Sequence, residues 1–222
     1  MGSCRRTILV RREDVILEKS IFLSFESYKY MDNLLIIVSS VLSLFSYTVY
    51  IVAILKGKAK PHRVTRFVIF IITLLATASL FAQGNTVAIW LSGSFALGSI
   101  LIFLLSIKFG IGGRSKTDII CLVIALVGIV LWKITNDASV ALYASIISDF
   151  VSQVPMLIKT FKFPETEVWT FYALSVFSAI LNVFAIHQWI VVNIVFPFYI
   201  IFIDLFIVLL ILRPRFLRIL RK

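Results

Sequence analysis

Two aspartates stand inside long apolar stretches of this sequence. Asp149 and Asp204 each lie in a run of residues long enough to cross a membrane. A charged side chain at the centre of a membrane-spanning helix costs roughly 2.5–3.5 kcal/mol, and such residues usually line cavities or proton paths. We expect no Lys or Arg within the spans to pair with either carboxylate. Both are therefore candidates for reversible protonation and proton coupling, although Asp204 lies nearer the cytoplasmic end, where water could solvate it.

Other polar residues recur at helical spacing in the same stretches. One predicted helical face carries Ser39, Ser43, Ser46 and Tyr50. We expect such side chains to line a cleft for a small polar solute. The candidate solute-binding residues are Ser46, Tyr50, Trp90, Gln153, Asn182 and Asn193. Serine stripes also serve as packing contacts between membrane helices, and Trp90 also suits anchoring at the membrane interface.

Two prolines fall within the predicted spans. Pro155 and Pro197 each remove one backbone hydrogen bond and free a carbonyl that can bind water or solute. They are candidate gating hinges, and static kinks would explain them equally well.

Few other residues suggest chemistry. The two cysteines, Cys4 and Cys121, provide no disulfide framework or metal cluster, and His62 and His187 lie in loops without partners at ligand spacing. No cluster of a nucleophile and a base is recognisable. We therefore expect no metal, no cofactor and no enzymatic activity.

The elements that must position these residues are seven apolar blocks. Of the 222 residues, 60% are hydrophobic and 15% charged, and the mean hydropathy is +1.03, well outside the range of soluble proteins. A helix of about 20 apolar residues crosses the hydrocarbon core, so the composition predicts an all-α membrane protein with seven transmembrane helices. The predicted spans are Leu34–Leu55, Phe67–Gln83, Thr86–Ile107, Ile119–Ile134, Ala138–Ile158, Val168–Ile186 and Ile190–Leu212.

Positive charge alternates between the loops. The first, third and fifth loops and the C-terminal segment together carry fifteen Lys and Arg, whereas the second, fourth and sixth loops carry one, Lys133. Basic loops face the cytoplasm, which predicts an integral membrane protein, in the plasma membrane, with its N-terminus outside and its C-terminus cytoplasmic. The net charge of +11 is then explained by topology and by anionic lipid headgroups, so we expect no nucleic-acid partner.

A weak internal repeat organises the blocks. A shift of 103 positions superimposes residues 33–107 on residues 136–210 and places Lys56 on Lys159 and Pro61 on Pro164; the bundles that we expect from it span residues 33–107 and 136–212. We interpret the two copies as parallel three-helix bundles, joined by a linker (residues 108–135) that contains the fourth helix. Residues 1–32 are then an N-terminal tail, for which Met31 is an alternative start, and residues 213–222 a basic cytoplasmic tail.

The segment from Ser148 to Lys159 resembles the PQ-loop signature of the SWEET and PQ-loop transporter superfamily. This resemblance implies the 3+1+3 arrangement, in which two three-helix bundles flank a linker helix. Asp149-Phe150 is similar to the segment of cystinosin-like, proton-coupled members, in which a comparable carboxylate takes up a proton, and Asp204 is similar to their seventh-helix carboxylate. The chain departs from the signature at Met156, which replaces the expected glutamine.

The resemblance also bears on the substrate. Sugar-carrying members use a pair of asparagines in the third and seventh helices. Asn193 could supply one, but Trp90 stands at the other position, which argues against a sugar substrate. The sequence thus predicts a transporter of a small polar solute, an amino acid or a sugar, that works by alternating access, with proton coupling as an added possibility. The alternative is a receptor on the same scaffold, ranked lower because it needs basic residues inside the cavity. The oligomeric state stays open.

Overall fold

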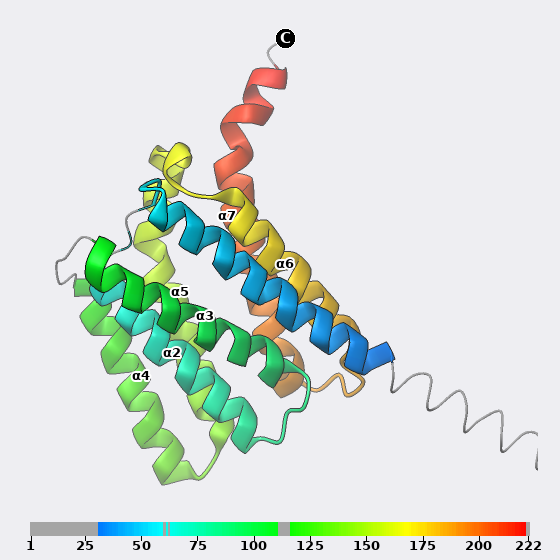
Figure 1. The fold of residues 1–222 in the computed structure, drawn as a ribbon. Helices are drawn as coiled ribbons and strands as arrows, with labels where there is room; N and C mark the ends of the chain where they lie inside the picture. Colours follow the sequence, from blue (N-terminus) through cyan, green and yellow to red (C-terminus); the bar gives the residue numbers. More distant parts are fainter. Residues whose placement is uncertain (1–30, 60, 62, 111–115, 221–222) are drawn as a thin grey trace, which may run out of the picture.

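The computed structural model describes residues 31–59, 61, 63–110 and 116–220, and these residues form helices and connecting turns without a strand. The first helix runs over Met31–Leu55. It is followed by α2 (Arg63–Ala82), α3 (Ala88–Phe109), α4 (Lys116–Thr135), α5 (Ala138–Lys162), the short 3-10 helix η1 (Pro164–Thr166), α6 (Trp169–Phe184) and α7 (Val191–Leu220) (Figure 1). A helix thus stands at each of the seven predicted positions.

Four of these helices are long and apolar enough to cross a membrane by length and composition. They are Met31–Leu55, Ala88–Phe109, Ala138–Lys162 and Val191–Pro214. The apolar parts of α2, α4 and α6 are shorter, over Arg66–Ala82, Val123–Thr135 and Trp169–Phe184. The all-helical, membrane-compatible architecture is therefore confirmed.

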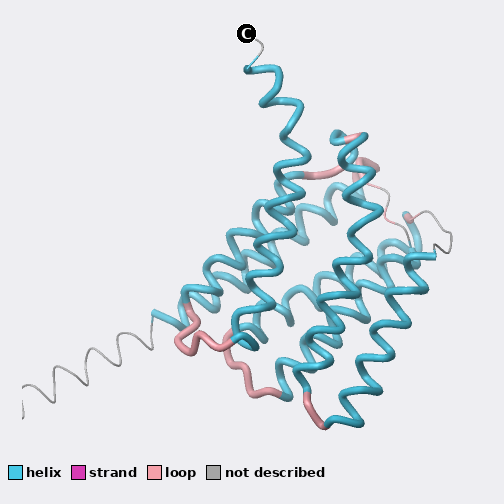
Figure 2. Tube along the Cα trace, turned by 180° about the vertical axis from the view of Figure 1, so that it is seen from behind, coloured by secondary structure: helices cyan, strands magenta, loops and turns pink. Residues whose placement is uncertain are grey.

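Successive helices run in opposite directions, so that their connections gather at two opposite ends of the molecule (Figure 2). One end holds the end of the first helix, the start of α2, the end of α3, the start of α4 and the turn at residues 163–168, and the described basic residues there are Lys56, Lys58, Arg63, Lys108, Lys116 and Lys162; we call it the basic end. The opposite end holds the connections at residues 83–87, 136–137 and 185–190. The charge asymmetry of the sequence is thus an asymmetry between the two ends of the structure.

Two helix ends are closed by glycine. Gly57 and Gly84 have φ values of 68° and 67°, a left-handed conformation that glycine adopts without steric cost. After the first helix, Lys58 N–H donates to the carbonyl of Ala53 and Gly57 N–H to that of Ile54, the pair of bonds that defines a Schellman motif. The same two bonds recur around Gly84. These motifs satisfy helix-end carbonyls that lipid could not.

The helices pack in a defined pattern. α2 packs against α3, α4 against α5, and α6 against α7, while α2 also contacts α5 and α4, and α5 contacts α7. The first helix lies beside α6 and α3 (Figure 1), where the Ser178 hydroxyl donates to the carbonyl of Ser39 over 2.6 Å. In α3, Gly98 allows the ring of Tyr47 to lie against its backbone. Small residues permit such close contacts between membrane helices.

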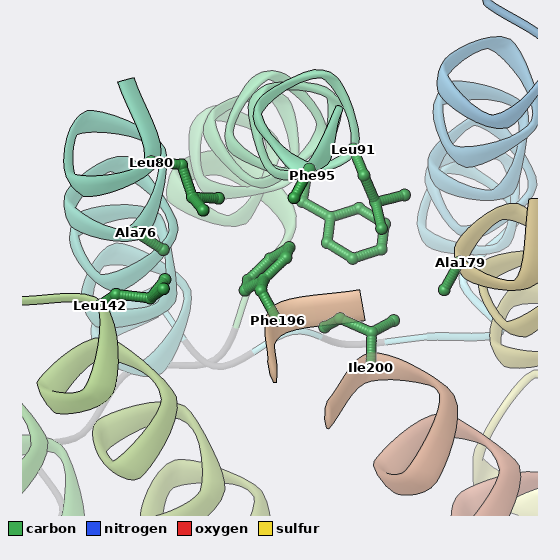
Figure 3. Packing of buried hydrophobic residues seen from close by; sticks show 9 residues of the cluster. Ala76, Leu80, Leu91, Phe95, Leu142, Ala179, Phe196 and Ile200 are labelled. Atoms are coloured by element: carbon green, nitrogen blue, oxygen red, sulfur yellow. The ribbon is translucent and has the colours of Figure 1, made fainter. Parts of the chain in front are cut away.

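A central apolar cluster joins five helices. Figure 3 shows side chains of α2, α3, α5, α6 and α7 meeting in the middle of the molecule. The central apolar cluster consists of Ala76, Leu80, Ala88, Leu91, Phe95, Leu142, Ala179, Phe196 and Ile200. All of them lie in the half of their helix nearer the opposite end, so the cluster seals that half of the molecule.

Several helices extend beyond the predicted spans, α2 and α7 among them. α2 begins at Arg63, four residues before the span predicted from Phe67. α7 continues to Leu220, so the segment expected as a basic tail from residue 213 is helical as far as residue 220. Hydropathy places the start of α2 too late and the end of α7 too early, because it registers where apolar residues begin and end and not where the helix begins and ends.

Candidate functional site

Asp149 lies in the middle of α5 and connects this helix to α7. Its Oδ2 accepts a hydrogen bond of 2.6 Å from the Tyr199 hydroxyl and a longer one, 3.5 Å, from Gln153 Nε2 one turn later. Hydrogen bonds to an ionised carboxylate are stronger than those between neutral groups. The predicted candidates Asp149 and Gln153 therefore belong to one site, to which Tyr199 adds a donor that the sequence analysis did not identify.

Asp204 forms the second carboxylate of this region. It is 7% exposed, so the alternative of a carboxylate solvated at the end of α7 does not hold. The Ser175 side chain of α6 lies near its carboxylate, and the charges of Asp204 and Asp149 repel one another. Two acidic groups from α5 and α7 thus share the interior, where a low dielectric strengthens their mutual repulsion.

Arg66 lies near the two carboxylates without an ion pair to either among the described residues. We expect no basic side chain within the spans to pair with the carboxylates, and Arg66, which is partly buried in the first turns of α2, attracts Asp149 only electrostatically. Its Nη2 donates to the Tyr50 hydroxyl over 2.6 Å, and the guanidinium carbon lies 4.9 Å from the centroid of the Tyr50 ring, within the range of a cation–π contact. The predicted second span starts at Phe67 and therefore leaves Arg66 just outside it.

A signal for this position is present in the sequence. Arg66 precedes Thr73 by seven residues and Thr77 by eleven, which places all three on one face of a helix. Thr73 and Thr77 are hydrogen-bonded to serine hydroxyls of α3 over 2.9 Å in each case, so this face looks into the protein and not into lipid.

Aromatic rings surround Arg66. Phe171 contacts Tyr50 at a centroid distance of 5.0 Å, Tyr47 at 5.3 Å and Tyr172 at 4.8 Å. The Tyr172 hydroxyl donates to Glu167 Oε2 over 3.3 Å, and Glu167 also attracts Arg66. These aromatic side chains come from the first helix and from α6, and offset or edge-on packing restricts their motion. We call Arg66, Tyr50, Phe171, Tyr172 and Asp149 the arginine site.

The other predicted solute-binding residues lie elsewhere. Ser46 is buried and its hydroxyl donates to the carbonyl of Ser43 in its own helix, over 2.6 Å. Trp90 is 60% exposed on the surface of α3. Asn193 Oδ1 accepts from Asn85 Nδ2 over 2.8 Å near the opposite end, where Asn85 Oδ1 in turn accepts from the first backbone amides of α3. The structure does not bring these three residues to Asp149.

Asn182 of α6 connects this helix to the start of α3. It is fully buried, and its Nδ2 donates to the carbonyl of Val87 over 3.1 Å. Its Oδ1 has no hydrogen-bond partner among the residues that the structure describes. This amide is therefore placed with the opposite end of the molecule and is separate from the arginine site.

The two prolines occupy uninterrupted helices. α5 continues through Pro155 and α7 through Pro197, and Pro197 is buried; the side chain of Pro155 lies outside the described residues. Asn193 and Val151 precede the two prolines by four residues, so their carbonyls lose the usual helix partner. The hinge prediction stays a prediction.

Metal chemistry has no candidate in the described ranges. No group of three or more His, Cys, Asp or Glu side chains that could hold a metal ion occurs within residues 31–59, 63–110 and 116–220. Around Asp149 the described residues supply the guanidinium of Arg66, a second carboxylate from Asp204 and several tyrosine hydroxyls. No protein-family model, no curated protein and no solved structure matches this chain.

Proposed function

We propose that this protein is a membrane transporter of a small polar solute that works by alternating access and is coupled to protons through Asp149. The observation that carries the proposal is the placement of this carboxylate: it lies midway along α5, and its partner Tyr199 comes from α7. A carboxylate at this depth is costly in a helix that serves only as an anchor. Its hydrogen bond with Tyr199 couples protonation to the contact between α5 and α7, because an ionised carboxylate accepts this bond more strongly than a protonated one.

The packing supports a 3+1+3 arrangement. The repeat makes the first helix equivalent to α5, α2 equivalent to α6, and α3 equivalent to α7. If each helix is exchanged for its equivalent, the contact between α2 and α3 becomes the contact between α6 and α7. The exchange also converts the contact between α2 and α5 into the one between α6 and the first helix. Such an exchange is expected of two parallel repeats related by an axis along the membrane normal. We propose that these repeats are the two bundles of the SWEET and PQ-loop superfamily.

The distribution of apolar and polar contacts supports alternating access. The central apolar cluster lies between the opposite end and Asp149, whereas Arg66, Tyr50 and Tyr172 lie between Asp149 and the basic end. A solute that enters from the basic end would therefore meet polar groups first and an apolar barrier behind them. By the positive-inside rule the basic end is cytoplasmic, with the N-terminus outside, and we place the protein in the plasma membrane.

Uptake into proteoliposomes tests the proposal. The purified protein is reconstituted and offered a panel of radiolabelled amino acids and sugars, with and without an imposed proton gradient. We expect the gradient to increase uptake of at least one solute and expect Asp149→Asn to abolish that increase. Asp137→Asn is the matched control, because Asp137 is exposed, lies in the turn before α5, and caps Ser139 N–H over 2.9 Å, a role that asparagine retains. Proton coupling that survives in Asp149→Asn refutes the assignment.

A receptor on the same scaffold is the second candidate, and Arg66 favours it. A receptor that grips the carboxylate of a peptide needs a basic side chain in its interior, and the structure supplies one. Solute that binds the purified protein with no time-dependent accumulation inside the vesicles would favour the receptor over the transporter.

A further inference from the structure

We propose that Arg66 is the residue that binds the solute and that the solute carries a carboxylate group. The inference rests on the proposed function and adds the chemical class of the cargo. It starts from a difference between the two basic side chains that are partly buried in the described part of the chain, Arg66 and Arg213; the other Lys and Arg whose side chains are described are exposed.

Arg213 lies far from the carboxylates. Its Nη2 donates to the carbonyl of Phe161 over 3.0 Å, and its guanidinium lies 4.1 Å from the centroid of the Phe161 ring. Its Nε is buried without a hydrogen-bond partner among the described residues. Phe161 follows Asp149 by twelve residues on α5, about 18 Å along the helix, so Arg213 contacts the end of α5 near the basic end and not the region of Asp149.

Arg66 has capacity to spare. A guanidinium has five N–H donors in a planar fork, and the hydrogen bond that the structure gives Arg66 uses one of them, toward Tyr50. Asp149 attracts Arg66, but its carboxylate is hydrogen-bonded by Tyr199 and Gln153 instead. A partly buried cation whose donors are incompletely used favours an incoming acceptor, and a carboxylate matches the guanidinium fork with two parallel bonds.

The location of Arg66 suits a ligand that both halves of the molecule must grip. Arg66 belongs to α2 and bonds to Tyr50 of the first helix; the Tyr50 ring contacts Phe171 of α6 at a centroid distance of 5.0 Å, and Arg66 attracts Asp149 of α5. In the proposed arrangement the first two elements belong to one bundle and the last two to the other. A solute bound to Arg66 would therefore contact both bundles, as alternating access requires.

The charges of the interior select the class of anion. Arg66 faces three carboxylates: Glu167 and Asp149 attract it, and Asp149 and Asp204 repel one another. A dianionic phosphate would add two negative charges to this set, whereas a monocarboxylate adds one. A neutral sugar offers no charged acceptor to the unused donors of Arg66. The carboxylate can belong to an amino acid, whose ammonium group Asp149 could accept, or to a simple organic acid that enters with a proton on Asp149.

The experiment compares solutes that differ only at the carboxylate. Proteoliposomes are offered amino acids and monocarboxylic acids, each alongside its primary amide, with glucose and glucose 6-phosphate as neutral and phosphorylated probes and with the membrane potential clamped at zero. We expect an acid to be taken up on the order of 10- to 100-fold better than its amide, the effect of one charged hydrogen-bonding partner. Arg66→Gln should abolish this preference. Arg63→Gln is the matched control, since Arg63 is exposed one turn earlier on α2 and bonds to the Ser106 carbonyl.

The outcomes separate this inference from the proposed function. Uptake of amides or glucose as good as that of acids, stronger uptake of glucose 6-phosphate, or an acid preference that survives Arg66→Gln would overturn the role of Arg66 while leaving transport standing. If the wild-type protein moves no solute, the transport proposal fails. Thermal stabilisation of the purified protein by acids but not by amides, lost in Arg66→Gln, would still support Arg66 as the carboxylate-binding residue. Absence of this stabilisation would overturn that role. If Arg66→Gln does not fold, Arg66→Lys keeps the charge without the fork, and an unchanged acid-to-amide ratio in that variant refutes the assignment.

Discussion

The contact between Gly98 and Tyr47 gives a sharp test of how the first helix is seated. A Cβ atom added at Gly98 would lie 2.2 Å from Cγ of the Tyr47 ring and 2.4 Å from both Cδ atoms. Ordinary contacts begin near 3.4 Å, so the ring must retreat by about 1.2 Å. It cannot do so freely, because the ring packs edge-on against Phe171 of α6 at a centroid distance of 5.3 Å.

Gly93→Ala is the matched control. Gly93 lies on the same helix, and its added Cβ would meet only Thr77 Cγ2, at 3.8 Å. Both substitutions gain the same helix propensity, about 0.5–1 kcal/mol, so the difference between the two variants isolates the collision with Tyr47. Overpacking of this kind costs about 1–3 kcal/mol, and we expect Gly98→Ala to be less stable than Gly93→Ala by that amount.

Thermal unfolding of the two variants in detergent micelles, followed by circular dichroism, measures this difference. In a Tyr47→Ala background the penalty of Gly98→Ala should vanish, because the ring that it strikes is gone, and the double-mutant cycle then reports the coupling directly. Equal stability of Gly98→Ala and Gly93→Ala in the wild-type background would show that the ring does not lie against α3, and the seating of the first helix would have to be reconsidered.

Three further substitutions test individual contacts. Asn193→Ala should lower stability by about 1–3 kcal/mol, because it leaves the nearly buried Asn85 amide without its acceptor; unchanged stability with loss of solute binding would instead assign Asn193 to the solute. Trp90→Ala should leave uptake unchanged, since this side chain is 60% exposed, and a loss of solute affinity in an uptake assay would return Trp90 to the binding site. His187→Ala should cost only about 0.2–1 kcal/mol in thermal unfolding, because its ion pair with Asp32 lies at the surface; a larger loss would mean that this pair holds the ends of the first helix and α6 together.

Hydropathy identified every helix but not the direction in which side chains point. The predicted and observed helices agree in number and position because an apolar block of sufficient length has few alternatives to a helix in lipid. Arg66 was missed because a long basic side chain at a helix end is expected to extend toward the headgroups. In the structure the Tyr50 hydroxyl gives it a partner in the interior.

Long-range partners could not be read from the sequence. Fifty residues separate Asp149 from Tyr199, and no local pattern links them. The alignment of the two repeats placed Trp90 opposite Asn193, yet one side chain is exposed and the other is bonded within a turn. A repeat conserves the course of the backbone, while the small rotations that decide which residues meet depend on packing between helices.

The position of α4 makes the two halves of the molecule unequal in rigidity. This helix packs against both α2 and α5, and Gly128 brings it so near α5 that a Cβ there would lie 2.4 Å from that of Ala144. α4 therefore covers and stabilises the contact between α2 and α5. The equivalent contact between the first helix and α6 has no such covering helix in the described part of the chain. We therefore expect α2 and α5 to move least relative to one another, and the first helix and α6, where the aromatic rings beside Arg66 lie, to move most.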